Sequence, residues 1–293
     1  MTSTALTTDR SPGSTTSART GRRPGLGTAL SWELRKLRAQ ARTRYTLLGC
    51  LIAPALIVVV LNGQQRPPKD TLYGRHLHDS GYAVPLLVLG FAAQWVFPLL
   101  TALVAGDIFA SEDSYGTWKT VLTRSVSRAQ LFWAKTAAAV LFAVSVLVVF
   151  AASTIVASLL VVGRQPLTGL TGQLIPSGTA LPLVIASWAT ALAPLLGFTA
   201  LAVLLSVRTR NPAIGVVGPV VIGLVMQLVG SLGGLDLVRH LLLTTSFESW
   251  HGLFTAHRFY DLLAEGLVVS AVWTLLALGL AYASLRRRDI TGG

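Results

Sequence analysis

The histidines of this chain are the side chains whose spacing could support metal binding. Imidazole nitrogens are common metal ligands, so a site built from these residues is one interpretation. Surface histidines without a fixed geometry are the commoner one. All five fall in two connecting segments, with His76 and His78 in a polar one and His240, His251 and His257 in the other.

Nucleotide hydrolysis by a phosphate-binding loop needs a glycine immediately before a lysine and a Ser or Thr after it. Lys119 and Lys135 each precede a threonine, but Trp118 and Ala134 occupy the glycine positions. The sequence also lacks the His-Glu-x-x-His and Gly-x-Ser-x-Gly motifs of metalloproteases and hydrolases. We therefore expect no catalytic residue, metal or cofactor in this chain.

Protein recognition is indicated within residues 107–135, a polar stretch between two long apolar runs. Ser111 can cap a short helix whose first turn holds Glu112 and Asp113, charges suited to the positive helix end. Ser127, with Gln130 three residues on, predicts a capping box for the next helix. An apolar face without lipid to cover it needs a partner surface. Such a face is formed at three- and four-residue spacing by Tyr115, Trp118, Val121 and Leu122.

Long charge-free intervals on both sides of this stretch indicate a membrane protein. The chain is 52% hydrophobic and 12% charged, whereas a soluble domain is about one quarter charged. Each interval can hold the roughly 20 residues that cross the hydrocarbon core. Prolines within them, including Pro98 and Pro194, predict bends. The fold class expected is all-α integral membrane, with six transmembrane helices at residues 45–62, 83–106, 136–163, 181–207, 212–231 and 266–285.

The distribution of Lys and Arg predicts that both termini lie in the cytoplasm. An even number of spans places the two ends of the chain on one side of the membrane. The segments on that side carry more than twice as many Lys and Arg as those on the other, and basic residues resist translocation. The net charge of +12 is therefore assigned to anionic lipid at helix ends rather than to nucleic acid.

Three further segments flank or connect the spans. Residues 1–27 are rich in Thr, Ser, Arg, Gly and Pro and are predicted to be a disordered cytoplasmic tail. Leucines at 26, 30, 34 and 37 alternate with charges and predict an N-terminal amphipathic interfacial helix, either a simple anchor or a partner contact. Residues 232–265 are long and apolar, which predicts a segment lying against or dipping into the outer leaflet and sealing the pathway.

Residues 107–135 resemble the loop after the second span in the membrane subunits of ABC-2 type exporters. In that family, the loop carries an acidic residue, then Gly-Thr, a leucine-rich turn, Pro-Val-Ser-Arg and a lysine before the next span. Ser125 stands where the family's proline usually is. The similarity in topology covers residues 28–290, which we expect to form one ABC-2 type transmembrane permease domain. The matching residues are Glu112, Gly116, Thr117, Val121, Leu122, Val126, Ser127, Arg128 and Lys135.

The resemblance implies that residues 112–123 form a cytoplasmic coupling helix that docks on a separate ATP-binding subunit. Glu112 and Arg128 are expected to pair with that partner or with each other, and Gly116 to allow close backbone approach. The alternative is a solvated loop whose charges only enforce the topology. The ATPase-coupling residues implied are Glu112, Tyr115, Gly116, Thr117, Trp118, Val121, Leu122 and Arg128.

We therefore interpret the chain as a non-catalytic permease subunit of an ATP-binding cassette exporter in the cytoplasmic membrane. The resemblance implies two copies of an ATP-binding subunit and a second permease subunit, in a homo- or heterodimer. No ionisable side chain lies near the middle of a predicted span, which disfavours proton or sodium coupling. A self-sufficient secondary transporter or channel is the main alternative, and a membrane enzyme a weaker one. Apolar spans suit a hydrophobic, drug-like, lipid or peptide cargo.

Overall fold

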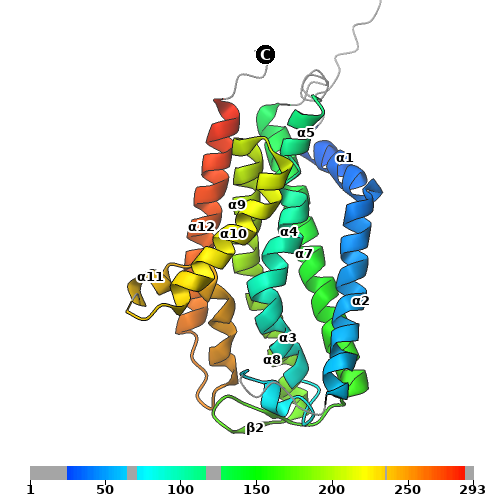
Figure 1. The fold of residues 1–293 in the computed structure, drawn as a ribbon, viewed down its shortest axis with the longest axis vertical. Helices are drawn as coiled ribbons and strands as arrows, with labels where there is room; N and C mark the ends of the chain where they lie inside the picture. Colours follow the sequence, from blue (N-terminus) through cyan, green and yellow to red (C-terminus); the bar gives the residue numbers. More distant parts are fainter. Residues whose placement is uncertain (1–24, 65–70, 117–126, 235, 288–293) are drawn as a thin grey trace, which may run out of the picture.

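Long helices standing side by side make up the computed structural model of this chain (Figure 1), which describes residues 25–64, 71–116, 127–234 and 236–287. Six of its helical segments are long and apolar enough to cross a membrane, which confirms the predicted spans. In chain order they are α2 (Ala41–Gly63), α3 (Ala83–Phe91) with α4 (Phe97–Ala105), α7 (Arg128–Val161), α8 (Ser177–Thr190) with α9 (Leu192–Thr209), α10 (Pro212–Ser231) and α12 (Asp261–Arg286).

Two of these spans are interrupted just before a proline, as expected for a residue without an N–H group. Pro98 cannot donate to the carbonyl of Gln94, and the chain there forms a π-helical turn, η2 (Ala92–Val96), between α3 and α4. Pro194 likewise leaves the carbonyl of Thr190 without its helical donor, and α8 ends at that residue. The predicted bends are thus local breaks in the helical hydrogen bonding.

The fourth span lies at the centre of the bundle. The second half of this span, α9, packs against α4, α7, α10 and α12. In its most apolar window 67% of the residues are buried, compared with 17%, 22% and 28% in the spans of α2, α10 and α12. Helices α2, α10 and α12 therefore present broad apolar surfaces, which must be covered by lipid or by another protein.

Short elements gather at the two ends of the bundle (Figure 1). One end, here called the α5 end, carries α1 (Leu26–Ala39), α5 (Ala110–Ser114) and the last turn of α12. The opposite end carries η1 (Gly74–His76) and the antiparallel pair β1 (Leu167–Thr168) and β2 (Leu174–Ile175). The segment before α12 forms two short helices toward that end, α11 (Asp236–His240) and η3 (Thr245–Phe254).

The segment predicted to lie on the outer leaflet is largely folded into the protein. Phe247, Trp250 and Phe254 are at most 3% exposed, because η3 packs against α8, α9 and α12. The aromatic side chains of η3 therefore fill the protein core instead of contacting lipid. Large apolar side chains stay exposed on both sides of η3, including Leu237 and Leu241 before it and Phe259 after it.

The N-terminal amphipathic segment is helical, as predicted, from Leu26 to Ala39. It packs along α7 through Ala29 and Leu37, which are buried, while Trp32 stays partly exposed. This helix is therefore attached to the bundle by protein contacts, and a contact with the membrane surface stays a prediction. Residues 1–24 of the predicted tail lie outside the described residues.

Candidate functional site

The predicted coupling residues divide into those the structure places and those it does not describe. Tyr115 is 80% exposed at the end of α5, and Gly116 follows with φ +63°, a left-handed conformation that favours glycine. A Cβ added to Gly116 would meet nothing within 4 Å in this chain, so the close backbone approach expected at a partner stays a prediction. Arg128 begins α7. Thr117, Trp118, Val121 and Leu122 lie outside the described residues.

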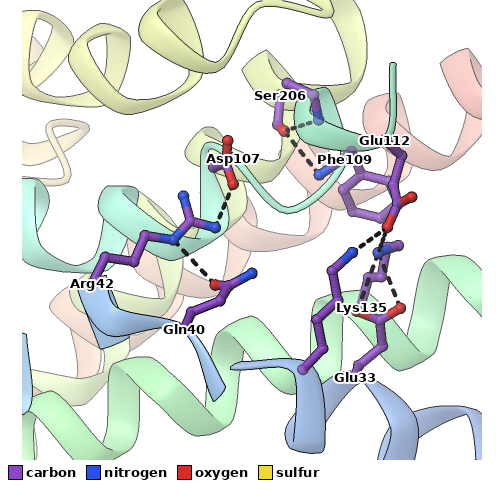
Figure 2. A network of polar contacts seen from close by, with 10 residues as sticks. Glu33, Gln40, Arg42, Asp107, Phe109, Glu112, Lys135 and Ser206 are labelled. Atoms are coloured by element: carbon purple, nitrogen blue, oxygen red, sulfur yellow. Dashed lines mark hydrogen bonds and ion pairs between the residues drawn. The ribbon is translucent and has the colours of Figure 1, made fainter. Parts of the chain in front are cut away.

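Glu112 lies on the inner side of α5 and is only 3% exposed. Its Oε1 accepts hydrogen bonds from Lys36 Nζ at 2.6 Å and from Lys135 Nζ at 2.9 Å (Figure 2). The sequence suggested Glu112 as a partner of an ATPase or of Arg128. In the structure this oxygen is engaged by two lysines of the same chain, and a pairing with an ATPase or with Arg128 stays a prediction.

Lys135 is the centre of this network and is fully buried, at 0% exposure. It extends from the first third of α7, and its Nζ lies 3.0 Å and 3.1 Å from the two oxygens of Glu33 on α1. A buried ammonium group is costly unless it is paired and hydrogen-bonded, and two carboxylates satisfy that need here. With Lys36, the cluster holds two positive and two negative side chains, which balances its charge.

Helix geometry explains how α1 supplies two members of the cluster. Ala29, Glu33, Lys36 and Leu37 recur at intervals of three and four residues, so they share one face of the helix. Ala29 and Leu37 pack against the bundle on that face, which directs the two charged side chains between them toward α5 and α7. α1 is therefore held to the bundle by apolar contacts and by ion pairs together.

A second ion pair joins the beginning of the first span to the end of the second. The guanidinium of Arg42, near the start of α2, contacts the carboxylate of Asp107, which follows α4 (Figure 2). Arg42 Nε also donates to Gln40 Oε1 at 3.1 Å, which fixes the side chain at the junction of α1 and α2. Asp107 is the more buried partner, with its side chain 13% exposed compared with 35% for Arg42.

The N-terminus of α5 is capped from another helix. Ser206 of α9 is fully buried, and its Oγ accepts hydrogen bonds from the backbone N–H groups of Phe109 and Ala110, at 3.2 Å and 3.0 Å. The predicted cap, Ser111, is wrong, because Ser111 lies inside the helix and Phe109 occupies the capping position without a side-chain cap bond. The predicted capping box of Ser127 and Gln130 at α7 is confirmed.

Aromatic contacts continue this connection to the last helix. Phe109 is fully buried against Phe132 of α7, with ring centroids 5.6 Å apart, and Phe132 in turn lies 5.2 Å from Tyr282 of α12. Arg128 Nη1 also donates to the carbonyl of Arg286 at 3.5 Å, a long and exposed contact. The short helix α5 is thus linked to α1, α7 and α9 directly and to α12 through Phe132.

Sequence reasoning missed Glu33, Lys36, Arg42, Asp107 and Ser206 as members of the site. One signal was present: Lys135 stands in an otherwise apolar stretch, and a lysine there requires a buried carboxylate. What the arrangement can do is mechanical. A force applied at the exposed Tyr115 would reach several spans through short, buried and directional bonds.

The five histidines considered as metal ligands do not come together at one site among the described residues. Among the described residues, no three His, Cys, Asp or Glu side chains are placed to hold one ion. His76 Nδ1 lies 3.0 Å from Asp79, and His240 contacts Glu265, each as a pair.

Comparison with protein families identifies the chain's relatives. A family model described as ABC-2 family transporter protein matches residues 29–230, from α1 through nearly all of α10. A comparison with curated proteins finds no match for the chain. The matched range contains every residue of the ion-pair network and Ser206.

Proposed function

The chain belongs to the ABC-2 family of transporter proteins, and on that premise we propose that it is an exporter subunit driven through its α5 end. As a permease of this family, it is the membrane component of an ABC transporter and associates with an ATP-binding subunit. We place the docking surface at residues 112–123, beginning at the exposed Tyr115. The cargo would move outward across the cytoplasmic membrane, with both termini in the cytoplasm.

The observation that supports this proposal is the way α5 is held. A partner can move the spans only if its contact with them stays rigid during the stroke. Glu112 is bonded to α1 and α7, and Ser206 fixes the first turn of α5 to α9. Just after those anchors in the chain, Tyr115 offers an exposed aromatic side chain at a bundle end rich in basic residues. The anchored residues of α5 and the exposed Tyr115 are therefore close in the chain, as a coupling element requires.

The weakly buried faces of α2, α10 and α12 support a second part of the proposal, assembly with another permease subunit. A second permease subunit would cover part of the apolar surface that these helices expose. The transport pathway would then run between the two subunits, which two ATP-binding subunits would drive. Whether the second subunit is identical or different is open in this proposal.

Co-purification in mild detergent tests the docking surface. Tyr115→Glu should remove the ATP-binding subunit from the permease, because a charge cannot be buried in an apolar contact. Leu174→Glu is the matched control, since Leu174 is 71% exposed on β2 at the opposite end. Loss of the ATPase from both variants, or from neither, would contradict the proposed location. Transport by the purified chain alone, driven by an ion gradient, would favour a secondary transporter or channel instead.

A further inference from the structure

An open cavity lies at the α5 end of the bundle, between the end of α9, the turn that follows it and the last turns of α12. It has a volume of about 460 Å³, which is within the range of ligand pockets. α9 and α12 pack against each other along the bundle, so their ends form the two sides of the cavity (Figure 1). None of the described residues that line it belongs to the ion-pair network.

Three arginines line this cavity. Arg208 lies in the last turn of α9, Arg210 directly follows α9, and Arg287 directly follows α12. All three are exposed. A guanidinium group is charged at every physiological pH and presents its N–H groups in a planar fork that matches phosphate oxygens. Like charges gathered at one cavity also repel one another, and a bound anion would remove that repulsion. The lining is therefore suited to a phosphate group.

The positive charge of this cavity is not neutralised by the carboxylates that the structure describes. Glu33, Asp107 and Glu112 at the same end form ion pairs with other side chains, and no ion pair among the described residues includes the three arginines. Residues 1–24, 117–126 and 288–293 adjoin this end in the sequence and lie outside the described residues. Together they contain more Lys and Arg than Asp and Glu, so they add positive charge in sum.

The backbone at Arg210 supports a role for its side chain. Arg210 has φ 56° and ψ 15°, and among the described non-glycine residues it alone has a positive φ. This left-handed conformation is strained for a residue with a Cβ, and glycine is the usual residue where a helix ends in this way. An arginine at this position gives up stability, which is typical of a side chain retained for function.

The wall beside the arginines is apolar and continues onto the surface of the last span. Leu280 of α12 lines the cavity and is 50% exposed. Leu276, which is 60% exposed, lies four residues earlier and therefore on the same face of the helix. A ligand with a charged head and a hydrocarbon chain would cover both the arginines and these leucines. A soluble phosphate would leave the leucines uncovered, so the observations favour a lipid.

We propose that this cavity binds the phosphate headgroup of an anionic membrane lipid, with an acyl chain lying along α12 at Leu280 and Leu276. Basic pockets between transmembrane helices on the cytoplasmic side suit such headgroups. Because Arg208 lies two residues after Ser206, the bound lipid would lie beside the residue that anchors α5. The cytoplasmic location of the cavity rests on the proposed function, whereas the binding itself can be tested on the permease alone.

Photolabelling of the purified permease in nanodiscs tests this site. The nanodiscs consist of phosphatidylcholine with a minor fraction of phosphatidylglycerol that carries a diazirine near the start of one acyl chain. Labelled peptides are identified by mass spectrometry, and we expect labelling within residues 205–213 and 276–287. Phosphatidylcholine with the same diazirine should label these peptides at least about five-fold less, because it has no net charge. Equal labelling by the two lipids overturns the proposal.

A charge-matched pair of triple variants separates a site from general attraction. Arg208→Gln, Arg210→Gln and Arg287→Gln in one chain should reduce labelling by phosphatidylglycerol at least about ten-fold. The control carries Arg35→Gln, Arg38→Gln and Arg44→Gln, which remove the same charge from exposed residues at the same end that line no part of the cavity. Its labelling should stay within about two-fold of wild type. An equal loss in both variants means that only the net charge attracts the lipid, and the proposal is then wrong.

Arg210→Gly separates binding from folding. Glycine adopts a φ of 56° freely, so the melting temperature should be kept or raised. Labelling by phosphatidylglycerol should nevertheless fall about three- to five-fold, because one arginine is lost from the cavity. Labelling at the wild-type level in this variant contradicts the proposal, because Arg210 would then have no contact with the headgroup.

Two other ligands of the cavity are distinguished in the same system. Glycerol phosphate carries the phosphate without acyl chains, and its displacement of the phosphatidylglycerol label at low millimolar concentration would show a site for a soluble anion instead of a lipid. If the triple variant of the cavity keeps its labelling but loses the ATP-binding subunit, the arginines form a protein docking surface, and the lipid proposal is wrong. Should that variant fail to fold, competition by unlabelled phosphatidylglycerol, compared with unlabelled phosphatidylcholine, decides the question in the wild-type protein.

The lipid site and the exporter function fail separately. If ATPase binding and ATP-dependent transport are observed but phosphatidylglycerol labels other peptides, the lipid site is wrong and the exporter function stands. If phosphatidylglycerol labels the cavity but no ATP-binding subunit associates, the exporter function is wrong and the lipid site stands.

Discussion

Lys135 Nζ and Glu112 Oε1 lie 2.9 Å apart in the protein interior, and this contact joins the third span to the short helix that follows the second. Both side chains are almost completely buried. Their pairing therefore determines whether α5 stays in place, and it can be tested directly.

We expect Lys135→Met to destabilise the protein by about 3–5 kcal/mol, because it removes the lysine that Glu33 pairs with and leaves the buried Glu112 with Lys36 alone. Glu112→Leu alone should also destabilise, since Lys135 then keeps only Glu33. In the double variant the cost should be clearly smaller than the sum of the two single costs. Melting temperatures in detergent measure this cycle, and additive losses would contradict a direct pairing.

Ser206→Ala removes the acceptor for the N–H groups of Phe109 and Ala110. Loss of a helix cap typically costs about 1–2 kcal/mol. We expect the melting temperature to fall modestly, while ATP hydrolysis by the bound partner becomes less tightly linked to transport. Ser145→Ala is a suitable control, because the Ser145 hydroxyl only donates to Leu141 within its own helix. Equal behaviour of the two variants would mean that the cap has no mechanical role.

The contrast between these two sites shows what the sequence can predict. The spans were predictable because lipid requires long charge-free helices. The start of α7 was predictable as well, because Ser127 and Gln130 form the capping box that the sequence indicates. The cap of α5 was not predictable, since Ser206 lies 96 residues from Ala110 in the sequence. Only the tertiary packing of α5 on α9 brings these two residues together.

The same reasoning applies to the ion-pair network. Periodicity placed Glu33 and Lys36 on the polar side of an amphipathic helix, where contact with solvent and lipid headgroups was the natural expectation. The structure turns that side toward α7, because Ala29 and Leu37 are the residues buried there. A small alanine, rather than the leucines alone, marks the packed face. Hydrophobicity patterns underestimate faces of this kind, in which charges are paired internally.

The crossing of α4 and α10 depends on two glycines in backbone contact. A Cβ on Gly106 would lie 2.2 Å from the carbonyl oxygen of Gly215, and a Cβ on Gly215 would lie 2.1 Å from that of Gly106. Gly106→Ala and Gly215→Ala should each lower the melting temperature strongly, because backbone must move. Gly279→Ala in α12 has open space and should be neutral or stabilising by up to about 1 kcal/mol. A similar effect at all three positions would contradict the close crossing.

His251 should make the stability of the protein sensitive to acid. Burial lowers its pKa in the folded protein to about 4, below the ordinary value of 6.5, so the unfolded chain binds the proton first. The stability is therefore complete above about pH 6.5 and is lost as the pH falls toward 4. Between pH 7.5 and 5.0 the loss due to this one group is expected to be about 1–2 kcal/mol.

The measurement compares wild type with His251→Gln at the two pH values, so that other titrating groups cancel. His251 lines a cavity together with other titratable groups, namely Asp236, His240, Glu248 and Glu265. Burial raises the pKa of Glu248, and Arg239 lowers it in part. Because the raised pKa of Glu248 acts in the opposite direction, wild type alone would be ambiguous. The variant should lose less stability than wild type on acidification, and His257→Gln, an exposed histidine, should follow wild type. An equal acid response in wild type and His251→Gln would show that the ring of His251 is not desolvated.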